Sequence, residues 1–322
     1  MSIAANQIGV LLATLLLAAL CLVSLGVGAG DVTLFGLWHG TAELDLLAIS
    51  RLPRTVAVVL TGAGLAIAGL IMQAITRNRF VEPSTAGTAQ SAELGILIVT
   101  LVWPAASLGF KTLAASVTAL IGTAFFLMTA HRLPPTQPFL VPLFGLVYGN
   151  VLGAVATLIA WQLDLLQYLS IWSSGDFSGV LRGRYELLWI GAFLVVAAWL
   201  VADRLTIMAL GRDTSIGLGI DYARMMQLGL CIISVISAIT VVVVGVVPFV
   251  GLVVPNLVSR LMGDNLRATL PVVAVSGAIL LLACDILGRL IRYPYEISVG
   301  TVMGIVGALL FLALIFQRRV RG

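Results

Sequence analysis

RLPRTVAVVLTGAGLAIAGLIMQAITRNRFVEPSTAG, residues 51–87, is the stretch that decides the fold of this chain. Arg51 and Arg54 open it, and an apolar run of about 20 residues follows, which is the length of helix that crosses a bilayer. A polar turn that begins at Arg77 and reaches Pro83 ends the run. Two arginines, an apolar run and a polar turn in this order predict a membrane-spanning helix that begins near Arg51 and ends near Arg77.

The composition extends this interpretation to the whole chain. Of its 322 residues, 60% are hydrophobic and only 10% are charged, against roughly 25% charged residues in a soluble domain. The mean hydropathy is +1.12, so the lipid bilayer must surround most of the apolar side chains. We therefore predict an all-α membrane protein in which residues 1–322 form a single transmembrane domain in contact with membrane lipid.

The polar residues show neither a pattern typical of nucleic-acid binding nor one typical of catalysis. The net charge of +4 comes from basic residues scattered between apolar segments, without a basic patch that would follow a nucleic acid. No GxxxxGK[ST] loop is present and Lys111 is the only lysine, so the chain does not hydrolyse ATP by itself. His39 and His131 are predicted on opposite sides of the membrane, and the three cysteines lie singly in apolar runs. We therefore expect no catalytic residue and no metal site in this chain.

Apolar stretches of spanning length occur about ten times along the sequence. They lie near residues 8–28, 55–75, 88–109, 112–130, 139–161, 187–203, 225–244, 248–262, 270–288 and 296–316. The eighth is short and contains Pro248 and Pro255, which leaves nine or eleven spans as alternatives. Ten spans place both termini on one side of the membrane. Small residues four apart, such as Gly62 and Ala66, predict close packing between helices.

The basic residues indicate which side is the cytoplasm. With ten spans, eleven of the 18 lysine and arginine residues fall on the side of the termini and the other seven on the opposite side. Because cytoplasmic loops carry an excess of Lys and Arg, both termini are predicted to be cytoplasmic.

Four arginines on the outer side run against that charge rule. They are Arg51, Arg54, Arg289 and Arg292. One interpretation is that they anchor helix ends by extending their guanidinium groups to the membrane surface. The other is a basic rim that captures an acidic partner protein or an anionic substrate through complementary charge.

Three acidic residues fall inside predicted spans, where ionisable groups are expensive and mark functional sites. Asp285 lies four residues before Arg289, so an ion pair within one helix explains it. Glu296 follows Pro294 at a predicted helix start, where the helix dipole favours an anion. Glu93 has no evident partner. It is the main argument for the alternative function, an ion-coupled secondary transporter that uses Glu93 and Asp285.

Two connections are long enough to form structure of their own. Residues 162–186, on the outer side, mix aromatic residues with Gly and Ser, which is typical of an interfacial helix followed by a turn. Residues 209–225, on the cytoplasmic side, place charges between an Ala-Leu-Gly opening and a central Leu218-Gly219. This second pattern predicts two short helices joined at a glycine, in a position to dock a partner.

The motifs of this chain resemble those of the FecCD family, the permease subunits of bacterial ABC importers for iron-siderophores, haem and cobalamin. The first block of matches is RLPR at 51–54, GAGLAIAG at 62–69, Met72-Gln73, RNRFVEP at 77–83 and Gly87. The second block is ALG at 209–211, LG at 218–219, PFVGLVVPNLVSRLMGDN at 248–265, LP at 270–271, Asp285, Arg289, Glu296, Gly300 and Gly304. The resemblance covers essentially the whole chain.

The resemblance implies a type II importer in the bacterial cytoplasmic membrane. In that architecture two permease subunits of ten helices each surround a pathway, two ATPase subunits lie below them, and a substrate-binding protein docks above. ATP and Mg²⁺ then belong to the partner ATPase, and this chain binds no cofactor. Iron travels caged by the siderophore, so no iron ligand is expected here either. The second permease is either another copy of this chain or a homologous one.

The resemblance also implies roles for individual residues. Arg51, Arg54 and Arg289 match the arginines that meet the binding protein, and Arg292 lies on the same side. The segment 209–222 matches the coupling helices that dock in the ATPase, with Leu210, Gly211, Asp213, Ser215, Leu218 and Gly219 as its matched residues. Residues of the translocation pathway and its gates are expected to include Gln73, Asn78, Arg79, Phe80, Gly145, Asn150 and Trp172, with 162–186 as the outer gate segment.

Two departures from the family pattern point to a subgroup. The family's usual Asn-Pro-Leu is Asn78-Arg79-Phe80 here, and TAQSAE at 88–93 replaces a Gly/Ala-rich stretch. The variant NRFVEPSTAGT resembles a subgroup that handles catecholate-type siderophores and pairs two different permeases. We therefore expect a ferric-siderophore permease, with a haem or cobalamin permease of the same family as the first alternative.

Overall fold

The computed structural model describes residues 3–28, 47–134, 137 and 139–319, and every regular element in this part of the chain is a helix. The elements are α1 (Ile3–Gly26), the π-helix η1 (Leu47–Arg51), α4 (Leu52–Thr76), α5 (Thr88–Val102), α6 (Leu108–Ala130), α7 (Leu140–Gln162), α8 (Leu166–Ser173), α9 (Leu188–Leu200), α10 (Ala202–Met208), α11 (Arg212–Gly217), α12 (Tyr222–Val243), α13 (Val250–Met262), α14 (Leu266–Leu290) and α15 (Val299–Arg319). The prediction of an all-α fold is confirmed.

Each of the ten predicted apolar stretches corresponds to a helical segment. Among the described residues, seven helices are long and apolar enough to cross a membrane, and α9 with α10 forms a further segment that is bent by 68°. The remaining two stretches are the shorter apolar helices α5, of 15 residues, and α13, of 13 residues. The chain is therefore a multi-pass membrane protein. The eighth stretch, predicted at 248–262, becomes helical only at Val250.

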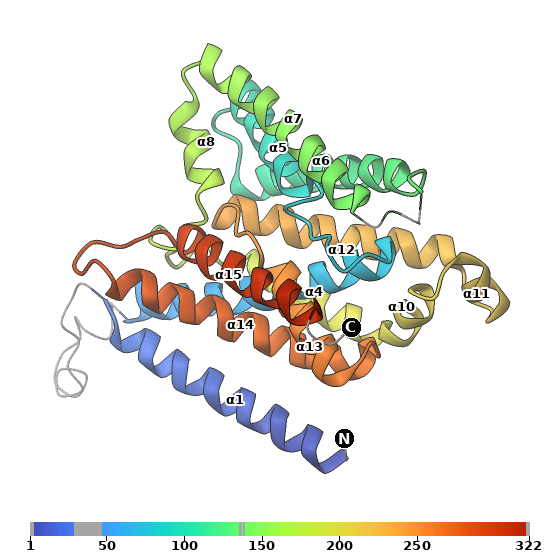
Figure 1. Cartoon of the computed structure of the whole chain (residues 1–322). Coiled ribbons are helices and arrows are strands. Elements are labelled where there is room, and N and C mark those ends of the chain that lie inside the picture. Colours follow the sequence, from blue (N-terminus) through green and yellow to red (C-terminus); the bar gives the residue numbers. More distant parts are fainter. Residues whose placement is uncertain (1–2, 29–46, 135–136, 138, 320–322) are drawn as a thin grey trace.

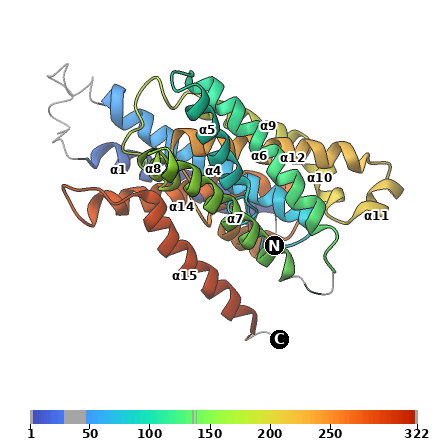
Figure 2. The same ribbon diagram turned by 90° about the horizontal axis from the view of Figure 1, so that it is seen from above.

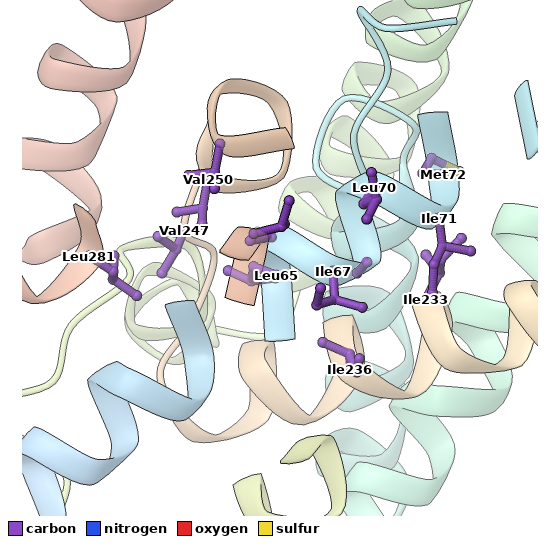
Figure 3. Close-up of a cluster of buried hydrophobic side chains, with 14 of the residues drawn as sticks. Leu65, Ile67, Leu70, Ile71, Met72, Ile233, Ile236, Val247, Val250 and Leu281 are labelled. Atoms are coloured by element: carbon purple, nitrogen blue, oxygen red, sulfur yellow. The ribbon is translucent and has the colours of Figure 1, made fainter. Parts of the chain in front are cut away.

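Helix α4 lies at the centre of the helical bundle. Helices α9, α12, α13 and α14 pack around it, and α12 also packs against α5 and α6, which joins a second group of helices, α5 to α8, to the first (Figure 1). In the core, Ile67 lies beside Ile236 and Ile71 lies beside Ile233 (Figure 3). The apolar segment that decides the fold is thus the most enclosed of the spans, because 72% of the residues in its apolar part are buried.

Glycines allow α4 to approach its neighbours closely, as the small-residue pattern predicts. A Cβ on Gly62 would lie 2.5 Å from the carbonyl oxygen of Gly277 in α14. A Cβ on Gly69 would overlap the backbone of Gly251 in α13. Two backbones therefore touch at each of these positions, and no larger residue fits there.

Replacing Gly69 by alanine is expected to lower the free energy of unfolding by about 2 kcal/mol. Alanine favours a helix by about 1 kcal/mol over glycine, but overpacking against backbone falls at the upper end of the usual penalty of about 1–3 kcal/mol. The matched control is Gly109→Ala in α6, where a Cβ meets no atom within 4 Å. Thermal melting of the purified protein in detergent measures both. Equal melting temperatures for the two variants would contradict the close approach.

Three helices are poorly covered by the rest of the chain. Only 6% of the residues in the apolar part of α1 are buried, and the corresponding values are 22% in α7 and 33% in α15. Helix α15 leaves the bundle toward its C-terminal end (Figure 2), and most of its exposed side chains are apolar. These faces are suited to lipid or to another membrane subunit. Helix α1 begins and α15 ends toward the side of α10 and α11 (Figure 1), as an even number of spans requires.

Candidate functional site

A group of charged residues, here called the arginine cluster, joins four segments at one end of the molecule. It consists of Arg51, Arg54, Asp285, Arg289 and Glu296. Arg54 donates to Oδ1 of Asp285 from Nε at 3.1 Å and from Nη2 at 2.8 Å, and to Oε2 of Glu296 from Nη1 at 2.7 Å. Arg289 donates to the other oxygen of Asp285 at 2.6 Å. Two guanidinium groups therefore compensate one fully buried carboxylate.

Other donors of Arg51 and Arg289 hold the C-terminal end of α1. Nη1 of Arg51 donates to the carbonyl oxygen of Leu25 at 2.8 Å. Nη1 of Arg289 donates to the carbonyl oxygens of Ser24 at 3.0 Å and Val27 at 2.7 Å. The last carbonyl groups of a helix have no partner within it and carry partial negative charge. The cluster thus fastens α1 to α4 and α14.

Three of the four arginines of the predicted basic rim are thus engaged by groups of this chain. Arg51 is 6% exposed and Arg289 is 4% exposed, while Arg54 is occupied by two carboxylates. Of the four arginines, only Arg292 is exposed, with its guanidinium carbon 5.8 Å from the centre of the Tyr295 ring. The buried partners explain the difference, because they satisfy charges that the sequence leaves free. Docking of a partner protein at this end stays a prediction.

The three acidic residues of the predicted spans have different surroundings. Asp285 forms the predicted pair within α14. The prediction that Glu296 begins a helix is wrong, since α15 begins at Val299 and Glu296 belongs to the arginine cluster. Glu93 accepts one hydrogen bond, from Oγ of Ser173 at 3.0 Å, and it forms no ion pair with any residue that the structure describes.

Residues 77–87, here called the polar turn, lie at the opposite end of α4. Arg77 ends the helix in the left-handed region, with a φ of 49°. The N–H of Asn78 donates to the carbonyl oxygen of Gln73 at 3.1 Å. Oδ1 of Asn78 accepts from the N–H of Phe80 at 2.9 Å, so this side chain stabilises the turn as asparagine commonly does. Asn78 is therefore needed for the shape of the predicted gate.

Helix α13 is held against the polar turn by side-chain amides. Nε2 of Gln73 donates to the carbonyl oxygen of Gly251 at 3.0 Å. Nδ2 of Asn256 donates to the carbonyl oxygen of Arg79 at 2.6 Å. Gln73 is one of the predicted pathway residues, whereas Asn256 is not. Both link α13 to the region where α4 ends.

Glu82 is a functional candidate that the sequence analysis missed. It is buried, and its Oε1 accepts from the N–H of Phe249 at 2.9 Å and from the hydroxyl of Ser84 at 2.7 Å. Phe249 is the N-cap of α13, so the carboxylate lies where the helix dipole favours negative charge. The available signal was a single acidic residue, directly before Pro83, in a turn whose other charged residues are arginines. Its partner is 167 residues away.

Arg79 and Phe80, the positions that depart from the family pattern, face α13 and α15. Arg79 forms a largely exposed ion pair with Asp264 at 2.7 Å. The ring of Phe80 meets that of Phe311 edge-on, with 6.0 Å between the ring centres. Together with Asn256 these residues line a cavity of about 440 Å³. A gate formed by them stays a prediction.

Residues 209–222, the coupling segment, lie at the same end as the polar turn. Helix α11 occupies part of the segment, and α10 directly precedes it. Only one of the two short helices predicted within 209–225 is therefore present, because α10 ends at Met208, before the segment begins. The glycine that joins α10 to α11 is Gly211, with a φ of +111°, and not the central Gly219. Gly219, with a φ of +80°, instead connects α11 to α12. Both values lie in the region that favours glycine.

The coupling segment presents a surface and touches the polar turn. Its exposed members include Leu210, Asp213, Ile216 and Leu218. Ser215 is buried, and its Oγ donates to the carbonyl oxygen of Gly211 at 2.7 Å. The guanidinium group of Arg77 lies against Gly211, because a Cβ there would be 3.0 Å from Nη1 of Arg77. A movement of α11 would therefore reach the end of α4 directly.

The other predicted pathway residues lie along α7 and α8. Gly145 packs against the carbonyl group of Thr85 in the polar turn. Asn150 lines a cavity with Glu93. The carbonyl oxygen of Trp172 accepts from the N–H of Val246 at 2.8 Å, which fastens α8 to the connection after α12. A helix predicted within 162–186 is present as α8, and its interfacial position stays a prediction.

The described part of the chain offers no site for a metal ion. It contains no set of three or more His, Cys, Asp or Glu side chains that could hold a metal ion. His39 lies outside the described residues. The candidate site thus consists of the arginine cluster and the polar turn, which lie at the two ends of α4, together with the cavities beside them.

Nearly the whole chain is similar to known membrane transport proteins. The FecCD transport family matches residues 15–317. The petrobactin import system permease protein YclN of Bacillus subtilis is 43% identical over 306 residues, which are 95% of this chain and 97% of that protein. The ferric-anguibactin transport system permease protein FatD of Vibrio anguillarum is 40% identical over 300 residues, which are 92% of this chain and 95% of that protein.

A solved structure has the same fold. It is described as a metal-chelate type ABC transporter in an inward-facing conformation, and the likeness covers 96% of this chain and 98% of that one. The TM-score is 0.82 at 22% sequence identity. The arrangement of helices is therefore shared even where most side chains differ.

Proposed function

The chain belongs to the FecCD transport family, and on this premise we propose that it is the permease subunit of an ATP-driven importer for ferric siderophores. The observation that carries the proposal is the match, over nearly the full length of each protein, to permeases named for petrobactin and for ferric-anguibactin. The chain itself is a transport subunit and not an enzyme.

The partners follow from the surfaces that this chain leaves uncovered. A second permease, either another copy or a homologous chain, covers part of the exposed faces of α7 and α15. Two ATPase subunits, which hold ATP and Mg²⁺, dock on the coupling segment in the cytoplasm. A substrate-binding protein docks at the end of the arginine cluster, on the outer face of the bacterial cytoplasmic membrane. Both termini of this chain are then cytoplasmic.

The structure supports a route for the force that opens the pathway. Closure of the ATPases on ATP moves α11, and Arg77 carries this movement from Gly211 to the end of α4. The polar turn follows, and with it α13, which is bound to the turn through Glu82 and Asn256. At the other end the arginine cluster keeps α1, α4 and α14 together. The helices rock, and the chelate passes between the two permeases.

The type of siderophore rests on a narrower argument. The motif NRFVEPSTAGT favours a catecholate ligand, and a haem or cobalamin permease of the same family is the alternative. Competition for uptake distinguishes them: excess ferric catecholate should suppress uptake of labelled substrate, and haem or cobalamin should not. Suppression by haem or cobalamin alone would contradict the siderophore assignment.

Ion-coupled transport is the alternative from a different class. It requires carboxylates that take up and release a cation. Asp285 is held by two arginines at 2.8 and 2.6 Å, so it has no coordination left for a transported ion. Glu93 remains free of ion pairs within the described part of the chain, but a single carboxylate makes a weak case for coupling.

Docking of the binding protein is expected to depend on the exposed cations near the arginine cluster. Arg182 and Arg292 are exposed at this end, where the N–H of Arg182 donates to the carbonyl oxygen of Ile49. Reversing both charges in the Arg182→Glu, Arg292→Glu variant should weaken docking by about tenfold or more at low salt, because like charges across an interface are unfavourable. Biolayer interferometry with the purified importer measures the affinity.

The matched control for this variant is Arg224→Glu. Arg224 is exposed at the opposite end, beside the coupling segment, so its reversal should leave the affinity for the binding protein unchanged. Equal affinities for all three proteins would show that these cations do not form the docking surface.

A further inference from the structure

A polar cavity lies in the second group of helices, away from the residues that transmit movement from α11 to α4. It has a volume of about 370 Å³ and lies between α5, α7, α8 and the connection after α12. Its polar lining residues are Gln90, Glu93, Asn150, Thr157 and Ser173. Glycines and other small residues make up much of the rest, so the space is open to a ligand group.

Glu93 is the unusual member of this lining. It is only 5% exposed, yet the neutral hydroxyl of Ser173 is its sole hydrogen-bond partner among the described residues. The other two buried carboxylates are better satisfied, because Asp285 faces two arginines and Glu82 caps a helix. A buried carboxylate without a cation is costly. A cation that enters the cavity would stabilise the charged form of Glu93, and the described part of the chain supplies none.

Gln90, one helical turn before Glu93, adds a second acceptor. Its Oε1 is buried and accepts no hydrogen bond. The cavity thus combines a carboxylate and an amide oxygen on one face of α5, both without adequate donors. A compact ammonium group carries three N–H donors and a positive charge, which matches this pair. An anionic iron centre does not match it, since two acceptors would repel a negative charge.

The position of the cavity connects it to transport. Ionisable residues within membrane helices face a water-filled cavity or the interior of the bundle, and they mark substrate pathways. Asn150 on α7 and Ser173 at the end of α8, next to Trp172, both border this cavity. A volume of about 370 Å³ lies at the low end of the usual range for ligand pockets, about 300–1,000 Å³. It therefore accommodates one arm of a chelate and not the whole complex.

We propose that Glu93 and Gln90 form a subsite that binds a protonated aliphatic amine on the backbone of the passing ferric siderophore. The subsite rests on the proposed function and deepens it, because it selects among siderophores after the binding protein has delivered them. The charge-assisted hydrogen bond favours the amine-bearing chelate over one whose nitrogen is neutral.

The test compares two substrates that differ only at the amine. One is a ferric siderophore with a free aliphatic amine, and the other is its N-acetylated derivative. Uptake is measured in liposomes that contain the complete importer, with saturating binding protein, so that differences in delivery do not enter. Wild type should transport the free amine faster, and Glu93→Gln should reduce the ratio of the two rates about tenfold, since one charged hydrogen bond is lost.

Two further variants separate recognition from packing. Thr157→Val changes the same cavity without touching a charge and should keep the wild-type ratio. Gln90→Glu combined with Glu93→Gln moves the carboxylate by one helical turn and should restore much of the ratio. If Glu93→Gln slows both chelates equally, or leaves their ratio unchanged, the subsite is refuted while the proposed function stands. If wild type shows no ATP-driven uptake of either chelate, both proposals fail.

Discussion

The Asp285→Ala variant is expected to lose about 3–5 kcal/mol of unfolding free energy, which is the usual effect of removing one partner from a buried ion pair. Asp285 is fully buried and receives hydrogen bonds from Arg54 and Arg289. Without it, three arginines remain around the single carboxylate of Glu296, and Arg289 stays almost completely enclosed. The connection between α1, α4 and α14 should weaken with it.

Thermal melting of the purified protein in detergent measures this loss. The matched control is Asp264→Ala, because Asp264 also pairs with an arginine but both side chains are largely exposed. Exposed pairs contribute about 0–1 kcal/mol, so the control should melt close to wild type. If both variants melt at the same temperature, the arginine cluster does not hold the helices together as described.

Placing charges on the coupling segment should give the largest functional effect. Ile216 is 55% exposed and Leu218 is 59% exposed, and an aspartate at either position would place an unpaired charge in the interface with the ATPase, which is costly. The Ile216→Asp, Leu218→Asp variant is expected to bind the ATPase about 100-fold more weakly, which corresponds to about 2.8 kcal/mol. Stimulated ATP hydrolysis and uptake should fall with it.

Co-purification of the ATPase with the tagged permease, followed by titration, measures this affinity. Ile291→Asp is the matched control, because Ile291 is an exposed apolar residue at the end of the arginine cluster. It should retain the ATPase at wild-type levels. Retention by the double variant as well would show that the ATPase docks elsewhere.

Local patterns in the sequence predict most of the fold. The ten apolar stretches, a helix within 162–186 and the small residues around Gly62 are patterns of residues near one another in the chain. The structure shows helices at each of these stretches and close packing at Gly62. The pair between Asp285 and Arg289 is of the same kind, since it spans four residues. The boundaries of α13 are less well predicted, because a loop continues to Phe249 within the eighth apolar stretch.

Contacts between distant residues account for what the sequence analysis missed. Arg54 pairs with Asp285 at a separation of 231 residues, so an arginine without an evident partner in the sequence is in fact paired. Glu82 caps α13 over 167 residues. Neither pairing follows from periodicity or composition. In the coupling segment, two glycines fitted a joint between short helices, and only the backbone shows that Gly211 is the one used.

We propose that this chain transports a ferric siderophore only when ATPase partners drive it. The direct measurement is uptake of iron-labelled siderophore into liposomes that contain the permeases, with the binding protein added. The account predicts uptake when the ATPase and ATP are present, and none with a proton gradient alone. Uptake that a proton gradient drives without any ATPase would contradict it.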